Sequence, residues 1–229
     1  MNLNQRFRIL ASATVVSTAA VLGLFSQAHA GAIRSAVSGV INSGGPGFGS
    51  LTDTLNQAGL SAGYTSGVSD FDAYIASGPT HTVTFSPFEW FSVLGTDSAS
   101  VTYNLGASYS LDGMALWNEE SSGIGLLDLL YSTDGVTFSA LASGLMPTDH
   151  SVVDYPADVF AFGAINAQYI RMDMSGCPQP NAGTFAACAI GEVAFREAST
   201  ISVPEPGSLA LVSLALVGVG LARRRMKAA

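Results

Sequence analysis

An Asp134-Gly135 pair limits the fold more than any other local feature of this sequence. It separates two short runs, 131–133 and 136–138, whose residues are typical of strands. Asp and Gly tolerate the positive φ angles that tight hairpin turns require. We therefore expect a tight antiparallel hairpin here and a body that is built mainly from strands.

Alternation of apolar and polar residues predicts further strands. In one of them Ile170, Met172 and Met174 should face the core, while Arg171 and Asp173 face solvent. The predicted strands cover residues 80–85, 89–93, 101–105, 109–117, 124–131, 159–162, 169–174 and 189–195. Because no long amphipathic helix accompanies them, they favour an all-β fold, an antiparallel β-sandwich or jelly roll.

The start of the body, residues 31–79, is rich in Gly, Ser, Ala and Thr and carries weaker signals. A helix is predicted over 51–60, where Ser50 can cap the N-terminus and Asp53 suits the helix dipole. Its exact placement is left open.

Five segments of the body follow one another in the order found in a known domain family. They are residues 101–106, 115–118, 131–138, 167–172 and 191–195. Together they resemble the discoidin (coagulation-factor type C) branch of the galactose-binding-like domains, with matching residues Leu105-Gly106, Asp134-Gly135, Tyr169-Ile170-Arg171 and Glu192. The resemblance implies a β-sandwich whose loops at one end hold ligands, with aromatic rings stacked on sugars.

The C-terminal tail has three parts. Val203-Pro204-Glu205-Pro206 precedes an uncharged apolar run over 207–222, and Arg223-Arg224-Arg225 follows it. As a helix the run would be about 24 Å long, whereas the hydrocarbon core of a membrane is about 30 Å thick. The run is therefore barely long enough to span a membrane. The arginines would hold the C-terminus in the cytoplasm by the positive-inside rule. A permanent single-span anchor is the alternative reading.

This three-part pattern resembles the PEP-CTERM sorting signal of Gram-negative bacteria, also catalogued as an ice-binding-protein C-terminal domain. The resemblance implies transient insertion into the inner membrane and cleavage near Pro204 to Pro206 by an exosortase, an integral membrane transpeptidase. The body would then pass to the cell surface or the extracellular matrix. Ice binding does not follow from the catalogue name.

The N-terminus carries a second export feature. Arg6 and Arg8 precede an apolar stretch over 9–25, and Ala28-His29-Ala30 fits the site that a signal peptidase cuts. We therefore expect a signal peptide over 1–30, one galactose-binding-like body over 31–202 and a sorting signal over 203–229.

The body is strongly acidic. Six of the nine Lys and Arg residues lie in the two ends, which leaves three against all seventeen Asp and Glu, a formal charge of −14 for residues 31–205. Such a surface repels nucleic acid, which we exclude as a partner. It can attract divalent cations or simply keep an exported protein soluble.

Cys177 and Cys188 are the only cysteines of the chain. In an exported protein an isolated pair favours a disulfide over a metal site or a redox couple. Closing so short a loop should stabilise the body by roughly 2–3 kcal/mol.

The sequence indicates no enzyme. Residues 31–202 contain two histidines, His81 and His150, and no motif of a serine hydrolase, zinc protease or phosphate-binding loop. Both histidines are expected at surface or turn positions. Glu119-Glu120 is expected in a solvated loop, because adjacent carboxylates do not control the separation that a hydrolase's acid and base need.

A binding module is the function class that remains. The candidate ligand residues in strand connections are Tyr64, Tyr74, Trp117 with Asn118, and Tyr155. Tyr155 is expected to be exposed, whereas Trp117 is expected in the core rather than on a sugar-binding surface. Two functions stay open: an adhesive or carbohydrate-binding module of an exopolysaccharide or biofilm matrix, and a structural matrix protein without a small ligand.

The cofactor to consider is calcium. The resemblance implies a structural ion near the N-terminal loop and the final strand, and Ca²⁺ needs about six to eight oxygen ligands. Asp70, Asp72 and Glu192 are the candidate ligands. The alternative is that Glu192 forms a salt bridge or caps a sheet edge while the two aspartates are solvated.

Overall fold

The computed structural model describes residues 31–84, 86–180 and 185–199. They fall within one compact unit, His29–Ile201. The predicted signal peptide, with Ala28 and Ala30, and the predicted sorting signal lie outside the described residues. Within the described ranges, no helix is long and apolar enough to cross a membrane.

Strands dominate the body, and every strand pair is antiparallel. The strands are β1 (Ile33–Arg34), β2 (Ser38–Ser43), β3 (Phe48–Gly49), β4 (Thr80–His81), β5 (Trp90–Phe91), β6 (Ser98–Trp117), β7 (Leu126–Ser132), β8 (Ser139–Leu145), β9 (Tyr155–Pro156), β10 (Asp158–Ser175), β11 (Ala189–Ile190) and β12 (Glu192–Glu197). The helices are the 3-10 turn η1 (Leu51–Leu55) and α1 (Phe71–Ala76). The predicted all-β class is confirmed.

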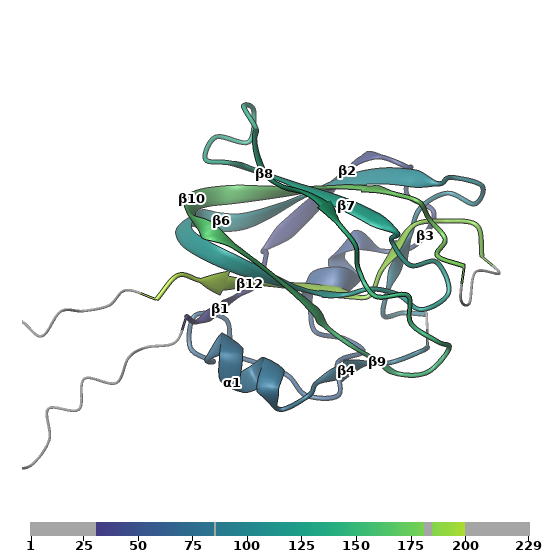
Figure 1. Cartoon of the computed structure of the whole chain (residues 1–229), viewed down its shortest axis with the longest axis horizontal. Helices are drawn as coiled ribbons and strands as arrows, with labels where there is room; N and C mark the ends of the chain where they lie inside the picture. The colour runs from purple at the N-terminus through teal and green to yellow at the C-terminus, as the bar shows by residue number, and fades with distance from the viewer. Residues whose placement is uncertain (1–30, 85, 181–184, 200–229) are drawn as a thin grey trace, which may run out of the picture. The chain divides into compact units, whose positions relative to one another are not determined.

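A seven-stranded sheet forms the frame of the sandwich (Figure 1). Its strand order is β1-β12-β6-β10-β7-β8, and β2 also pairs with β6. A three-stranded sheet, β11-β5-β3, packs against one face, so that Trp90 and Ile190 join the main core. The short pair β4-β9 and helix α1 lie together on the other side of the large sheet.

The two longest strands each join two predicted ones. β6 covers both 101–105 and 109–117, and β10 covers both 159–162 and 169–174. β6 and β10 pair with each other along their length, and the pairing contains two register shifts. The backbone ladder therefore continues past the segments in which the alternation of apolar and polar residues is interrupted. The predicted core residues Ile170, Met172 and Met174 are at most 2% exposed, which confirms that part of the pattern.

Burial along β6 shows how the two cores are divided. Every second residue is buried over 98–105, but all residues are buried over 113–117. Leu116 packs in the main core with Trp90, whereas Trp117 points to the opposite face and packs with Phe71 and Tyr155. The sheet is therefore covered on both faces at this end, and Trp117 is a core residue, as predicted.

The hairpin at Asp134 exists, but it is wider than predicted. Tyr131 pairs with Ser139, so the connection is longer than a two-residue turn. Oδ1 of Asp134 accepts hydrogen bonds from the backbone N–H groups of Val136 and Thr137, both at 2.8 Å, and this organises a larger loop. Phe138, predicted as strand, lies in that loop.

The N-terminal part of the body differs most from prediction. Three strands within 31–79 and helix α1 were not predicted. The helix expected over 51–60 is the shorter η1, although its predicted cap is confirmed, because Ser50 and Asp53 form a capping box. The strand expected over 80–85 has two residues, and that over 189–195 divides at Gly191 because its halves join different sheets.

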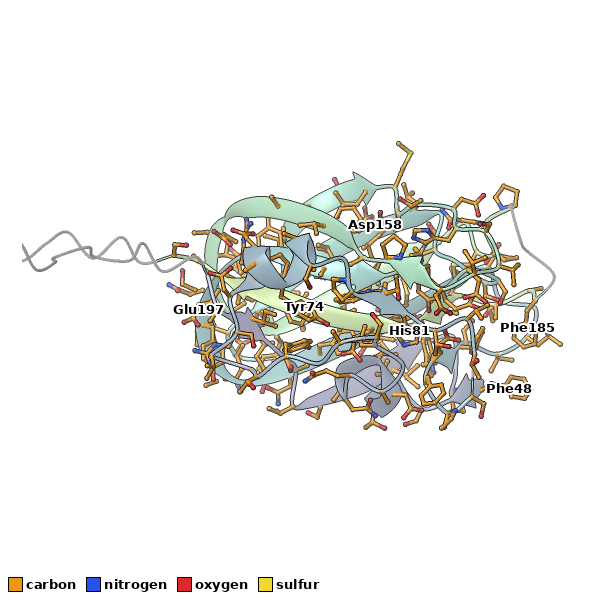
Figure 2. All side chains as sticks on the ribbon, turned by 90° about the horizontal axis from the view of Figure 1, so that it is seen from below. Phe48, Tyr74, His81, Asp158, Phe185 and Glu197 are labelled. Carbon is orange, nitrogen blue, oxygen red and sulfur yellow. A yellow bond between two sulfur atoms is a disulfide. The ribbon has the colours of Figure 1, made fainter. Side chains whose placement is uncertain are left out.

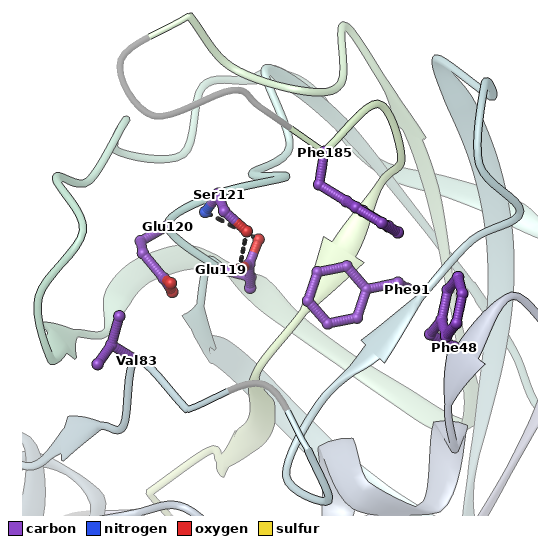
Figure 3. Close-up of a pocket in the computed structure, with 7 residues that line it drawn as sticks. All are labelled: Phe48, Val83, Phe91, Glu119, Glu120, Ser121 and Phe185. Carbon is purple, nitrogen blue, oxygen red and sulfur yellow. Dashed lines mark hydrogen bonds between the residues drawn. The ribbon is translucent and has the colours of Figure 1, made fainter.

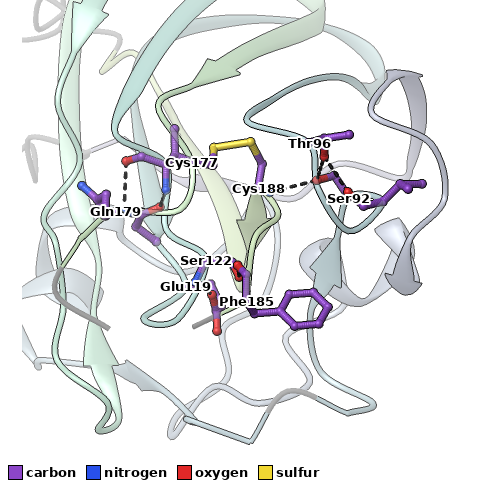
Figure 4. The surroundings of a disulfide bond; sticks show 11 residues. Ser92, Thr96, Glu119, Ser122, Cys177, Gln179, Phe185 and Cys188 are labelled. Atoms are coloured by element: carbon purple, nitrogen blue, oxygen red, sulfur yellow. Dashed lines mark hydrogen bonds between the residues drawn. A yellow bond between two sulfur atoms is a disulfide. The ribbon is translucent and has the colours of Figure 1, made fainter. Parts of the chain in front are cut away.

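The predicted disulfide between Cys177 and Cys188 is confirmed (Figure 4). It closes a loop with a sequence separation of 11, which should stabilise the fold by about 3 kcal/mol. The backbone N–H of Cys188 donates to Ser92 Oγ at 2.8 Å, and this hydroxyl lies 2.6 Å from that of Thr96. The bridge thus anchors the segment that carries Phe185.

Candidate functional site

A cavity of about 210 Å³ opens at one end of the body (Figures 2 and 3). It is lined by Phe48, Val83, Phe91, Glu119, Glu120, Ser121 and Phe185. These residues come from β3, the segment after β4, β5, the loop after β6 and the segment before β11. Figure 2 shows Phe48 and Phe185 at one end of the body and Glu197, the last residue of β12, at the other.

Three phenylalanines form an aromatic wall of the cavity. The ring centroid of Phe185 lies 5.7 Å from that of Phe48 and 5.4 Å from that of Phe91, with interplanar angles of 71° and 83°. Such edge-to-face contacts hold the rings in place. Since Phe48 is 54% exposed and Phe91 only 4%, the wall offers an apolar surface to solvent at one edge.

Glu119, Glu120 and Ser121 form an acidic wall. The loop folds around the Glu119 carboxylate, which accepts hydrogen bonds from Ser121 N at 3.0 Å, from Ser121 Oγ at 2.5 Å and from Ser122 N. Ser122 Oγ in turn donates to the Phe185 carbonyl at 2.6 Å. Ser122 therefore links the Glu119 carboxylate of the acidic wall to the Phe185 backbone of the aromatic wall.

A third carboxylate, that of Glu89, belongs to the same cluster. Glu89 directly precedes β5 and is fully buried. One oxygen from each of Glu89, Glu119 and Glu120 lies within 4.8 Å of the other two. Tyr155 Oη donates to Glu89 Oε1 at 2.6 Å, so a buried hydroxyl orients this carboxylate.

His81 lies beside Glu89, with 3.3 Å between Nδ1 and Oε1. The same nitrogen lies 3.0 Å from the Thr82 carbonyl, which can only accept a hydrogen bond, so Nδ1 carries a proton. Tyr155 Oη also lies 3.0 Å from this nitrogen. A buried chain of hydrogen bonds thus leads from His81 and Tyr155 to the cluster.

The three carboxylates repel one another. Two unit charges about 5 Å apart repel by about 3 kcal/mol at an effective dielectric constant of about 20. Burial raises the pKa of Glu119 from 4.5 to about 7; the hydrogen bonds from Ser121 and Ser122 oppose this rise, and the Glu89 charge adds to it. Burial and then the Glu119 charge raise the pKa of Glu120 to about 8. Positive charge at this cluster would therefore be stabilised.

The predicted ligand residues do not line this cavity. Trp117 is fully buried, and its Nε1 donates to the Pro79 carbonyl at 3.1 Å. Asn118 is fully buried, and its amide donates to the Thr148 carbonyl at 3.0 Å. The predicted exposure of Tyr155 was wrong, because β9 pairs with β4 and the Tyr155 ring packs in the second core.

Tyr64 and Tyr74 belong to that second core as well. Tyr64 is 8% exposed, and its ring centroid lies 5.2 Å from that of Tyr74. The ring of Tyr74 also contacts Trp117, at 6.5 Å. These two aromatic residues therefore support the fold rather than the cavity.

Two other expectations about polar residues were wrong. His81 is fully buried, because it sits in the β4-β9 pair opposite Tyr155. Glu119 and Glu120, expected in a solvated loop, are 1% and 5% exposed. Their loop is buried because its neighbour Ser122 is hydrogen-bonded to the segment around Phe185.

The structure does not gather the predicted calcium ligands. Asp70 caps the N-terminus of α1, and Asp72 lies 3.1 Å from a guanidinium nitrogen of Arg196. Glu192 is fully buried, and its Oε2 accepts a backbone N–H at 2.8 Å. In the part of the chain that the structure describes, the acidic residues that do meet in a group of three are Glu89, Glu119 and Glu120.

Sequence reasoning missed Phe48, Phe91, Phe185 and Glu89. Glu89 offered no signal of burial, because Glu is rarely fully buried in proteins. Phe185 offered a signal, because it lies close to Cys188 in a crosslinked segment. Phe48 stands in a glycine-rich stretch with no signal of its own.

Residues 202–225 match the PEP-CTERM protein-sorting motif. The predicted sorting signal is therefore confirmed, and the motif indicates export and surface localisation. Among curated proteins, none matches the chain in sequence.

Several solved carbohydrate-binding modules are similar to the body. Chitosan-binding module 1 from a chitosanase/glucanase of Paenibacillus sp. IK-5 is 17% identical, with 72% of this chain and 96% of the module covered and a TM-score of 0.46. The CBM32 of AlyQ, in complex with 4,5-unsaturated mannuronic acid, is 14% identical, with 71% and 96% covered and a TM-score of 0.43. A pectin binding carbohydrate binding module is 22% identical, with 75% and 96% covered and a TM-score of 0.39. What these modules bind is a property of those proteins.

Proposed function

We propose that the body binds carbohydrate in the cavity between the aromatic and acidic walls. The observation that carries this proposal is that the exposed ring of Phe48 and the carboxylates of Glu119 and Glu120 line one cavity. The C–H face of a sugar ring packs on an aromatic ring, while its hydroxyl groups donate to carboxylates. Apolar walls with a few oriented polar groups are the usual design of small-ligand sites.

The size and charge of the cavity suggest the kind of ligand. At about 210 Å³ it is smaller than the roughly 300–1,000 Å³ of drug-sized sites, so we expect it to receive a single sugar unit of a glycan. The acidic wall and the net charge of the body oppose polyanionic glycans. Neutral glycans should therefore bind better than polymers of uronic acids when divalent cations are absent.

We further propose that the protein is part of the exopolysaccharide or biofilm matrix of a Gram-negative bacterium. A signal peptidase would remove residues 1–30, and an exosortase would process the sorting signal during transient insertion in the inner membrane. The body's last strand ends at Glu197, at the end opposite Phe48 and Phe185 (Figure 2). The last strand thus ends away from the cavity, which suits a binding site that must face outwards.

Removal of the aromatic wall is expected to weaken glycan binding. Phe48→Ala should lower the affinity for the best ligand of a glycan array about tenfold, the effect of losing about 1.4 kcal/mol of ring contact. Because the Phe48 side chain is half exposed, the melting temperature of the variant should differ little from that of the unmodified body. Titration calorimetry with the array's best neutral glycan measures the change.

Val136→Ala is the matched control, since Val136 is 84% exposed and does not line the cavity. It should bind as the unmodified body does. If the body binds no glycan, or if Phe48→Ala and Phe185→Ala both bind normally, the carbohydrate proposal fails and a structural matrix protein without a small ligand is favoured.

Processing at both ends is expected in the native host. Intact-mass analysis of the surface protein should show a chain that begins near Gly31 and lacks everything beyond about Pro206. A host without its exosortase should retain the longer form. Detection of residues 223–229 in the mature surface protein would contradict the proposed cleavage.

A further inference from the structure

Among the described residues, the cluster of Glu89, Glu119 and Glu120 brings three acidic groups together without a Lys or Arg beside them. The only Lys or Arg residues over 31–205 are Arg34, Arg171 and Arg196. Each of the three pairs elsewhere: Arg34 with Glu197, Arg171 with Asp173, and Arg196 with both Asp72 and Asp112. The body therefore has no arginine or lysine left to neutralise the cluster.

His81 is the basic side chain beside the cluster, but of the three carboxylates it contacts only that of Glu89. Its Nδ1 lies 3.3 Å from Glu89 Oε1, and its proton also points to the Thr82 carbonyl at 3.0 Å. A single imidazole in this position cannot balance three carboxylates. Charge balance then requires protons or a cation from solution.

Two carboxylate oxygens of the cluster also lack hydrogen-bond partners. Within the described ranges, Oε2 of Glu89 and Oε2 of Glu120 are buried and have none. Glu89 is fully buried and Glu120 is 5% exposed. A buried carboxylate oxygen without a partner is costly, and such an atom is what a bound cation would satisfy.

Three of the other four carboxylate oxygens are already oriented by hydrogen bonds. Donors from Ser121 and Ser122 hold both oxygens of Glu119, and the Tyr155 hydroxyl holds Oε1 of Glu89 at 2.6 Å. Hydrogen bonds of this kind orient metal-binding carboxylates in known sites. The segment directly before β5 and the loop after β6 thus present carboxylates to one point.

We propose that Glu89, Glu119 and Glu120 bind a divalent cation at the acidic wall of the cavity, and that this cation is Ca²⁺. The donors are all carboxylate oxygens, which suit hard cations, and Ca²⁺ accepts flexible sets of about six to eight oxygens. Glu119 and Glu120 line the cavity, so the ion can enter from solvent and complete its coordination with water there. If the proposed carbohydrate binding also holds, sugar hydroxyl groups could replace that water.

The test uses the chelator-treated body and two readouts that involve no glycan. Terbium, which replaces calcium, should show luminescence sensitised by nearby aromatic rings such as that of Tyr155, and added Ca²⁺ should quench it competitively. Millimolar Ca²⁺ should also raise the melting temperature, because the ion binds the folded state. Magnesium at the same concentration should compete less well, since it demands a more regular coordination.

Isosteric variants decide where the ion binds. Glu89→Gln and Glu119→Gln should each weaken Ca²⁺ binding by at least about 100-fold, because the loss of a ligand exceeds the 10- to 100-fold effect of losing an orienting partner. Glu120→Gln, at the edge of the cavity, serves as a third variant if either of the others fails to fold. Glu192→Gln, a buried acid outside the cluster, is the control and should retain binding.

Two results would overturn the inference. One is an unchanged melting temperature together with no competed terbium signal in the unmodified body. The other is binding that survives in Glu89→Gln and Glu119→Gln but disappears in Glu192→Gln, since the ion would then occupy another site. Neither result depends on whether the body binds carbohydrate.

Discussion

Trp117→Ala is expected to lower the free energy of unfolding by about 3–5 kcal/mol, the usual effect of removing a buried tryptophan. The Trp117 side chain is fully buried and packs with Phe71 and Tyr155 in the second core. Its removal leaves a cavity there and deprives the Pro79 carbonyl of the donor that now lies 3.1 Å away. Urea unfolding at constant pH measures the loss.

Trp117→Phe is the matched variant. It keeps most of the ring packing and loses the indole N–H, so its stability should fall by less than that of Trp117→Ala. A Trp117→Ala protein of normal stability that no longer binds glycan would show that this residue acts as a sugar-binding surface and not as part of the core.

The stability of the body is expected to fall as pH rises above about 4.5, with Glu192 as a principal cause. Burial raises the pKa of Glu192 well above its ordinary value of 4.5; hydrogen bonds from Gln57 and Val193 oppose this rise, and the charge of Asp53 adds to it. Below pH 4.5 both folded and unfolded states are protonated, and the stabilisation is complete. Above it, the unfolded state releases its proton first, so stability is lost up to the raised pKa at about 1.4 kcal/mol per pH unit.

Glu192→Gln isolates this contribution. The variant and the unmodified body should have similar stability near pH 4.5, and the variant should be the more stable at pH 8, because Gln cannot ionise. Chemical unfolding at a series of pH values, with chelator present throughout, gives the difference. A constant difference across this range would show that Glu192 does not carry the pH dependence.

Local patterns in the sequence were sufficient wherever structure depends on near neighbours. The alternation around Ile170, Met172 and Met174 identified a one-sided strand, because side chains point to opposite faces in turn. Ser50 was recognised as a helix cap, since capping involves only the next few residues. The sorting signal predicted over 203–229 was recognised in the same way, because it is a linear motif, and the family match covers 202–225.

Strand length explains the main gaps in the predicted fold. The unpredicted strands β1, β3 and β9 each contain two residues. Alternation cannot be detected over so short a distance, and these strands exist because their partners β12, β5 and β4 supply the hydrogen bonds. At Asp134 the local turn signal correctly predicted that the chain reverses direction. It did not predict the length of the loop, because Tyr131 pairs with Ser139.

The sequence by itself determined the all-β class, the acidic charge, the disulfide and the C-terminal sorting signal, because each depends on composition or on residues close in the chain. Tertiary structure alone decided the candidate site. Phe48, Phe91, Glu119 and Phe185 meet only after four distant segments have packed together. The same packing buried Tyr155, which a local pattern placed in solvent, because burial is set by what covers a residue and not by its neighbours in sequence.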